Sequence, residues 1–351
     1  MNMTISVLRG RVLILWIVLS IIFLIACSFP AWTEEIPFRS GPFHVVGDLR
    51  KPEGQGPLPV ILFVHGDGPN NRTAGGMYLP IMARMLRAGF ATFAWDKPGT
   101  GESTGRIDRS RLSEQRSQIV LDAIALLKKR ADIDPRRIGL WGISQAGYVM
   151  PTVLSKSADV AFMIAVSCPG QAGIDQGIYL VTAQAVCGGL PKEDAAEVRA
   201  LLSAVERART YEEYVRYKKR LLAYPALASI TELGLNMRIK PEEEWHADDL
   251  NGPYYWDPME VIEQTTIPVL AFFGDKDTQV DPRQGMQAYR AGLERAGNRN
   301  FRVELIPDAD HSLVLSETGC LEERRRRSRS QWLNYGPPYL DILENWLRKL
   351  Y

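Results

Sequence analysis

Apolar residues recur along this chain in two alternating patterns, continuous runs and runs with helical spacing. The continuous runs are rich in β-branched and aromatic residues, which is typical of strands buried on both faces. They cover residues 60–64, 90–95, 138–141, 160–166, 267–273 and 301–306. The helical spacing marks residues 79–88, 116–129, 282–296 and 339–350, and a helix is also expected to run to Leu154. Strands that alternate with helices in this way predict an α/β protein with a mainly parallel sheet.

The alternation is interrupted between residues 171 and 266, where strand character is scarce. Charged amphipathic helices are predicted at 194–209 and 211–222, and an aromatic stretch with Pro and Gly follows at 245–256. We interpret 171–266 as a helical cap inserted into a core whose two parts are residues 40–170 and 267–351.

The first 26 residues differ from the rest of the chain. Arg9 and Arg11 precede an uncharged apolar run from Val12 to Ala26. This run is short for a bilayer span of about 20 residues and fits a secretory signal peptide over 1–26. A tether over 27–39 would connect it to the core.

The end of this run, Leu24-Ile25-Ala26-Cys27, resembles a bacterial lipobox. The resemblance implies cleavage before Cys27, lipid attachment to its sulfur and a membrane partner. Ordinary signal cleavage near Ser28 and an uncleaved anchor are the alternatives. All three place the protein outside the cytoplasm, in the cell envelope on the periplasmic or extracellular side.

Composition narrows the class of function. The 351 residues are 46% hydrophobic and 24% charged, with a net charge of +1, as in an ordinary globular protein. The balance of charge gives no reason to expect a nucleic-acid partner. No cysteine or histidine cluster suggests a metal. Cys168, Cys187 and Cys320 are expected to be buried thiols, and a Cys187–Cys320 disulfide is the alternative.

The apolar run at 138–141 leads into Gly142-Ile143-Ser144-Gln145-Ala146-Gly147. A strand, a sharp turn and a helix in that order form a nucleophile elbow, in which small residues let the helix pass close to the strand. Ala146 stands where such elbows usually have Gly. Ser144 is therefore the candidate nucleophile, and an ordinary Ser in a helix-starting turn is the alternative.

A Ser hydroxyl needs a base, and the base needs an orienting carboxylate. The chain has four histidines, and His311 follows a predicted strand late in the sequence, as the order Ser, Asp, His requires. We expect His65 to hold its own loop. For the acid, Asp277 follows the strand at 267–273, whereas Asp281 resembles a helix N-cap and Asp275 a turn residue.

Two backbone amides could stabilise an oxyanion beside Ser144. One is the N–H of Gln145, directly after the nucleophile, and the other is the N–H of Asp67 in the loop that begins at His65. We expect the carboxylate of Asp67 to turn away from this site, since it would otherwise oppose the negative charge.

These motifs together resemble the α/β-hydrolase superfamily. His65-Gly66, the loop 96–103, Gly142-x-Ser144, Gly274-x-x-Asp277 and Asp310-His311 occur in the order of that family, over about residues 40–170 and 266–351. Their character is similar to the bacterial branch of dienelactone-hydrolase-like and prolyl-oligopeptidase-like enzymes. The resemblance implies an α/β-hydrolase fold, a Ser144–His311–Asp277 triad, an acyl-enzyme intermediate and no cofactor.

The function expected from this resemblance is that of a serine esterase acting on small-molecule acyl esters. A peptidase or amidase, an acyl-thioesterase and a non-catalytic binding protein of the same fold are the alternatives. The cap aromatics Trp245, Tyr254, Tyr255 and Trp256 are expected to line the substrate pocket, or else to form the core of the cap. The arginine run at 324–327 is expected to be solvated, with contact to anionic lipid as a second possibility.

Overall fold

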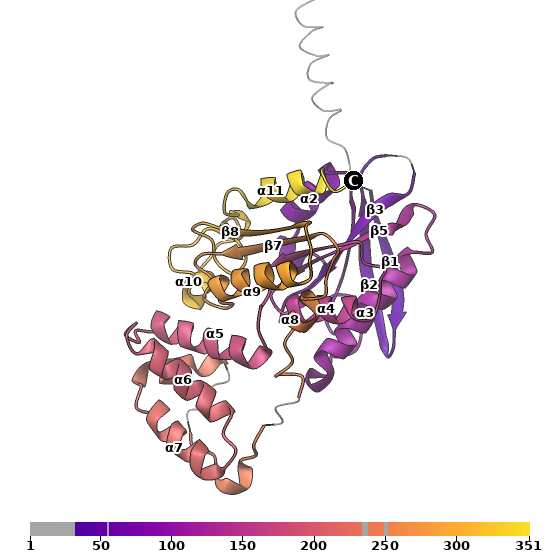
Figure 1. Cartoon of the computed structure of the whole chain (residues 1–351). Helices are drawn as coiled ribbons and strands as arrows, with labels where there is room; N and C mark the ends of the chain where they lie inside the picture. The colour runs from indigo at the N-terminus through magenta and orange to yellow at the C-terminus, as the bar shows by residue number, and fades with distance from the viewer. Residues whose placement is uncertain (1–31, 55, 234–237, 249–251) are drawn as a thin grey trace, which may run out of the picture.

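The computed structural model describes residues 32–54, 56–233, 238–248 and 252–351 (Figure 1). The predicted signal peptide and Cys27 lie outside the described residues. The centre of the molecule is an eight-stranded sheet with the order β1-β2-β4-β3-β5-β6-β7-β8. Its strands are β1 Trp32–Ser40, β2 Phe43–Lys51, β3 Leu58–Val64, β4 Ala91–Trp95, β5 Ile133–Ile143, β6 Phe162–Val166, β7 Val269–Gly274 and β8 Phe301–Ile306. The α/β class with a mainly parallel sheet is confirmed.

The six strands β3 to β8 all pair in parallel. β1 and β2 form an antiparallel hairpin on one edge, and β2 pairs with β4 in antiparallel orientation. β1 begins at Trp32, so residues 32–39 form a strand and not a tether. Its alternating pattern explains the difference, because Ile36 and Phe38 point into the core while their neighbours are exposed.

Helices cover both faces of the sheet (Figure 1). On one face, α2 (Leu79–Arg87) and α11 (Tyr339–Leu347) pack on aromatic residues of the strands, including Phe63 and Trp141. The other face carries α3, α4, α8 and α9. These helices are α3 Leu112–Leu127, α4 Ala146–Leu154, α8 Met259–Ile262 and α9 Pro282–Arg295. Two hydrophobic clusters result, one on each face.

A helical insertion lies between β6 and β7 and projects from one end of the sheet (Figure 1). It includes α5 Gly173–Cys187, α6 Ala195–Glu206, α7 Tyr211–Leu221, η3 Pro225–Leu233 and η4 Glu242–Glu244. Its apolar residues form a third cluster, separate from those of the sheet. The remaining short helices are η1 Ala74–Gly76, η2 Arg109–Arg111, α10 Leu321–Arg325 and η5 Gln331–Leu333.

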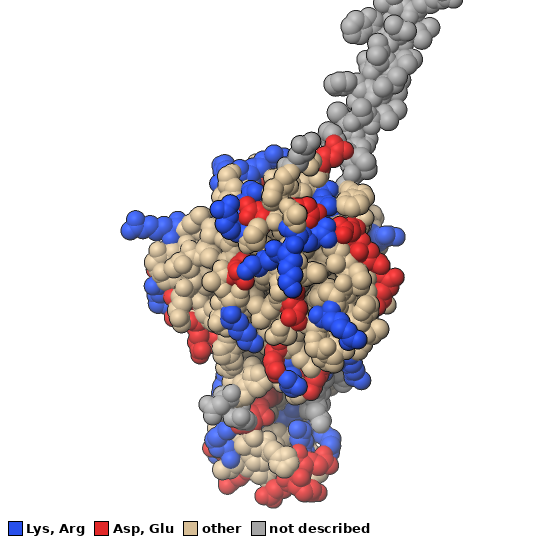
Figure 2. All heavy atoms as spheres, turned by 90° about the vertical axis from the view of Figure 1, so that its right-hand side faces the viewer, with Lys and Arg blue, Asp and Glu red and all other residues tan. Residues whose placement is uncertain are grey.

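The charged surface is mixed, in keeping with the composition. In Figure 2, Lys and Arg are interspersed with Asp and Glu over the core, and acidic residues gather at the far end of the insertion. Among the described residues, no helix is long and apolar enough to cross a membrane, and no group of side chains could hold a metal ion.

Candidate active site

Ser144 occupies a sharp turn between β5 and α4. β5 ends at Ile143, and α4 begins at Ala146. The φ angle of Ser144 is 59°, a left-handed conformation that is uncommon for residues other than glycine. Its N–H is held by Val166 O at 2.9 Å, on the neighbouring strand β6. This strained and tethered turn is the arrangement that presents a serine hydroxyl above the sheet.

Small residues around Ser144 allow the helix to begin so close to the strand. A Cβ atom added at Gly142 would lie 2.6 Å from the Cβ of Ala146, and one added at Gly147 would lie 2.8 Å from the Cβ of Cys168. Ala146 is fully buried. Its methyl group is therefore accommodated because Gly142 has no side chain, and the departure from the usual glycine causes no clash.

His311 and Asp277 form a buried pair at the ends of β8 and β7. His311 Nδ1 lies 2.8 Å from Asp277 Oδ2, and their side chains are 7% and 0% exposed. The other carboxylate oxygen accepts the N–H groups of Gln279 at 2.7 Å and Val280 at 2.9 Å. Because the carboxylate is an acceptor, Nδ1 must carry a proton, which leaves Nε2 available to accept one. No hydrogen bond joins Ser144 Oγ to His311 in this structure.

The other two acidic candidates in this region have structural partners. Asp281 caps α9 by accepting the N–H groups of Arg283 and Gln284, both at 3.1 Å. Asp275 accepts the N–H of Ala309 at 3.2 Å and so ties together the loops after β7 and β8. Asp277 is the carboxylate of the three that contacts His311.

The loop that carries His311 is anchored by a buried charge cluster. Asp310, with its side chain 0% exposed, accepts from Arg324 at 2.8 Å and from Arg327 at 2.5 Å. Both guanidinium groups also lie 5.1 Å from the ring of Trp332. The expectation of a solvated arginine run is wrong for these two residues, because the turn of α10 directs them inward onto Asp310. Arg325 and Arg326 point outward.

The loop after β3 presents the amide of Asp67, and its orientation has a visible cause. Lys97 Nζ donates to Gly66 O at 3.0 Å and to Gly68 O at 2.6 Å. In a trans peptide the C=O and N–H point in opposite directions. The hydrogen bond to Gly66 O therefore turns the N–H of Asp67 away from Lys97, and that N–H has no acceptor among the described residues. The carboxylate of Asp67 is exposed.

Arg116 links this loop to the residue after Ser144. Its buried guanidinium donates to His65 O and to the side-chain oxygen of Gln145. Burial lowers the pKa of Arg116 to about 10 and that of Lys97 to about 7. The sequence analysis assigned no role to either cation: Lys97 belongs to the motif loop 96–103, and Arg116 begins a predicted amphipathic helix.

His65 is fixed by both ring nitrogens. Nε2 lies 2.6 Å from Trp95 O, and Nδ1 lies 3.3 Å from the hydroxyl of Tyr78. Burial lowers the pKa of His65 to about 3, so the ring is neutral near pH 7. The role expected for His65, holding its loop, matches these contacts.

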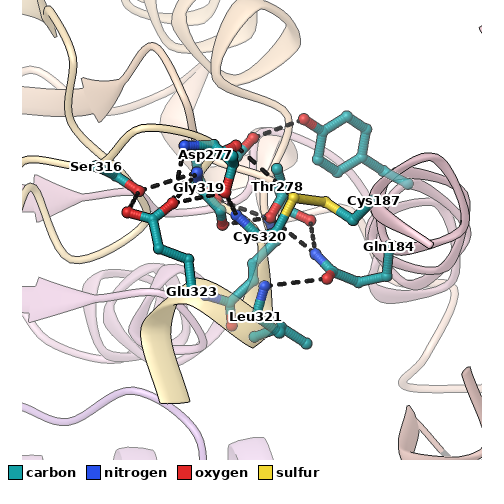
Figure 3. The surroundings of a disulfide bond; sticks show 12 residues. Gln184, Cys187, Asp277, Thr278, Ser316, Gly319, Cys320, Leu321 and Glu323 are labelled. Carbon is teal, nitrogen blue, oxygen red and sulfur yellow. Dashed lines mark hydrogen bonds between the residues drawn. A yellow bond between two sulfur atoms is a disulfide. The ribbon is translucent and has the colours of Figure 1, made fainter. Parts of the chain in front are cut away.

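Helix α5 fastens the insertion to the loop that carries Asp277 (Figure 3). The hydroxyl of Tyr179 donates to Asp277 O at 2.7 Å, and Gln184 donates to the hydroxyl of Thr278 at 2.8 Å. A disulfide joins Cys187, at the end of α5, to Cys320. The expectation of free thiols is therefore wrong for these two residues and right for Cys168, which is buried and unpaired. No spacing rule could reveal a pair 133 residues apart.

The insertion holds a cavity of about 350 Å³ beside α5. Trp245 and Tyr254 line it, whereas Tyr255 and Trp256 do not. Tyr255 instead donates its hydroxyl to Asp248 at 2.9 Å. Ser144, Asp277 and His311 are absent from the lining, so this cavity is separate from the candidate catalytic residues.

The parallel sheet and the arrangement of Ser144, Asp277 and His311 are typical of the alpha/beta hydrolase class, and a comparison with known families agrees. The model of the alpha/beta hydrolase family matches residues 61–320. The chain belongs to the alpha/beta hydrolase family.

Two curated proteins are similar to this chain in sequence, at about a quarter identical residues. Esterase EstD of Thermotoga maritima is 24% identical over 288 residues, which are 77% of this chain and 58% of that protein. The match thus spans little more than half the length of EstD. An uncharacterised 31.7 kDa protein from the traX-finO intergenic region of Escherichia coli is 26% identical over 81% of this chain and 93% of its own length.

Solved structures share the fold. The Pyrococcus furiosus esterase Pf2001 superimposes with a TM-score of 0.51 at 16% identity, over 80% of this chain and 83% of that one. A proline iminopeptidase from Mycobacterium smegmatis gives 0.53 at 16% identity, over 90% and 98%. At these identities the likeness concerns the fold alone.

Proposed function

We propose that this protein is a serine hydrolase that cleaves carboxylic esters through Ser144, His311 and Asp277. The observation that carries the proposal is the buried His311–Asp277 pair, at 2.8 Å, together with a strained serine at the end of β5. The sequence similarity to EstD, which is named as an esterase, favours esters over amides.

The proposed mechanism follows from the protonation of His311, in which Nδ1 carries the proton and Nε2 can accept one. His311 Nε2 takes the proton of Ser144 as Oγ attacks the acyl carbonyl, and the resulting imidazolium is stabilised by Asp277. The N–H groups of Gln145 and Asp67 stabilise the oxyanion. His311 then protonates the leaving alcohol, and an acyl-enzyme remains on Ser144. Water activated by His311 releases the carboxylic acid and restores the serine.

Chemical labelling combined with a matched variant tests this function. Hydrolysis of a short p-nitrophenyl ester is expected to disappear in Ser144→Ala, with circular dichroism unchanged. A fluorophosphonate probe should label Ser144 alone, as mapped by mass spectrometry. Label on another residue, or full activity in Ser144→Ala, would refute the triad. A panel of esters, thioesters and aminoacyl amides would then separate esterase from thioesterase and peptidase.

We also propose that the protein is exported and anchored to the membrane through Cys27. The signal-like segment and the lipobox resemblance carry this proposal, and the Cys187–Cys320 disulfide supports it because such bonds persist in oxidising compartments. Metabolic labelling with palmitate should mark the wild-type protein and leave Cys27→Ala unlabelled. Equal labelling of the two proteins would rule out lipidation at this residue.

A further inference from the structure

The cavity in the insertion is lined by both apolar and polar side chains, and one of them is a buried lysine. Side chains of α5, α6 and α7 form the walls, among them Ile178, Val181, Leu202 and Leu221. Its volume, about 350 Å³, lies in the range of small-molecule sites, roughly 300–1,000 Å³. A short apolar chain fits along the apolar part of this lining.

Lys218 is the unusual member of this lining. It is 6% exposed, although it carries a charge. Within the part of the chain that the structure describes, its ammonium group forms no hydrogen bond and no ion pair. Its nitrogen is not among the buried side-chain atoms without a partner, so it is accessible from the open cavity, where a ligand or water completes its contacts. The nearby carboxylate of Glu206 also acts on its charge. Burial lowers the pKa of Lys218.

The other charged groups of the lining are less suited to define the ligand. Lys240 and Asp248 are exposed, and Asp248 already accepts the hydroxyl of Tyr255. Glu206 is partly buried; burial raises the pKa of its carboxyl, whereas the positive charge of nearby Lys218 lowers it. Lys218 is nevertheless the least exposed of the charged residues that line the cavity.

We propose that this cavity is a binding site for a carboxylate with an apolar tail, the carboxylate pairing with Lys218 and the tail lying among the apolar side chains of α5, α6 and α7. The site is distinct from the candidate triad because α5 lies between them. Tyr179 on α5 contacts the Asp277 loop, whereas Gly177, Ile178 and Val181 line the cavity. The proposal does not depend on hydrolysis, and a medium-chain fatty acid represents the ligand class.

Binding to full-length Ser144→Ala protein tests the site without interference from turnover. Octanoate and octan-1-ol share a chain and differ in the head group. We expect octanoate to bind at least tenfold more tightly, by calorimetry and by a change in tryptophan fluorescence from Trp245. Equal binding of the two compounds, or no binding of either, would overturn the proposal.

Two added substitutions locate the site. Lys218→Met should remove the preference for octanoate, whereas Lys219→Met, an exposed neighbour on the same helix, should keep it. A Cβ added at Gly177 meets no atom within 4 Å, so Gly177→Leu should fill the cavity without a clash and abolish binding of both compounds. An unchanged preference for octanoate in Lys218→Met, or octanoate binding retained in Gly177→Leu, would place the ligand elsewhere and refute the assignment. Circular dichroism verifies the fold of each variant.

Discussion

The loops after β3 and β8 each place a histidine at the same end of the parallel sheet, yet the two imidazole rings differ in their hydrogen bonds. His65 uses both nitrogens on structural partners, Trp95 O and the hydroxyl of Tyr78. His311 uses Nδ1 on Asp277 and leaves Nε2 without a partner among the described residues. The position of a histidine in the topology is therefore not enough to make it a base, because the base also needs a free ring nitrogen. A ring with both nitrogens bonded has no site left for a substrate proton.

The two loops also differ in the acceptor groups to which their anchoring cations donate. Near His65, Arg116 and Lys97 donate to backbone carbonyl oxygens. Near His311, two arginines converge on the carboxylate of Asp310. Cations on carbonyls orient peptide groups, and so aim N–H groups at the site. Cations on a buried carboxylate instead fix the loop and thereby the imidazole that follows it.

The largest effect should distinguish the two histidines. We expect His311→Gln to lower kcat for a p-nitrophenyl ester by about 10⁴-fold or more, because no base remains for Ser144. His65→Gln should keep kcat within about tenfold, because it removes a structural contact. Steady-state kinetics on folded protein measures both. Similar losses in the two variants would contradict the difference in role.

The anchor beneath His311 should have the next largest effect. Asp310→Asn removes the carboxylate of Arg324 and leaves Arg327 with only the longer contact to Glu323 at 3.5 Å. Removing one partner of a buried pair costs about 3–5 kcal/mol. Urea unfolding should show this loss. Asp308→Asn breaks the Lys276 pair, in which Asp308 is 69% exposed, and should cost less than about 1 kcal/mol. Equal stability of the two variants would show that the cluster does not anchor the loop.

Sequence patterns sufficed for the six strands from β3 to β8, the main helices and the short list of candidate residues, because strand runs and the turn at Ser144 are local signals. They could not show which residues meet across the fold. Arg324 and Arg327 appear in the sequence as part of a surface charge run, and only the turn of α10 brings them to Asp310. The same holds for Cys187 and Cys320, and for Lys218, whose burial depends on how three helices pack.

The neutrality of His65 predicts a pH dependence of stability. Its pKa is about 3 when folded, against 6.5 as the ordinary value, so the unfolded chain binds the extra proton between these limits. Stability should therefore fall as the pH drops from 6.5 toward 3, by about 2 kcal/mol between pH 6.5 and 5. Urea titrations of wild type and His65→Gln should differ by this slope. Parallel pH profiles would show that His65 does not stay neutral in the folded protein.

The smallest effect concerns Lys97, which acts through the peptide group that it orients. Lys97→Met should release Gly66 O and let the Asp67 amide turn, which we expect to lower kcat about tenfold with little change in KM, since direct loss of an oxyanion donor costs roughly 10²–10³-fold. Lys97→Arg restores a cation and should recover most of kcat. A purely structural lysine would instead change stability and leave kcat of the folded protein intact in both variants. Rescue by arginine but not by methionine would therefore separate orientation of the amide from packing of the loop.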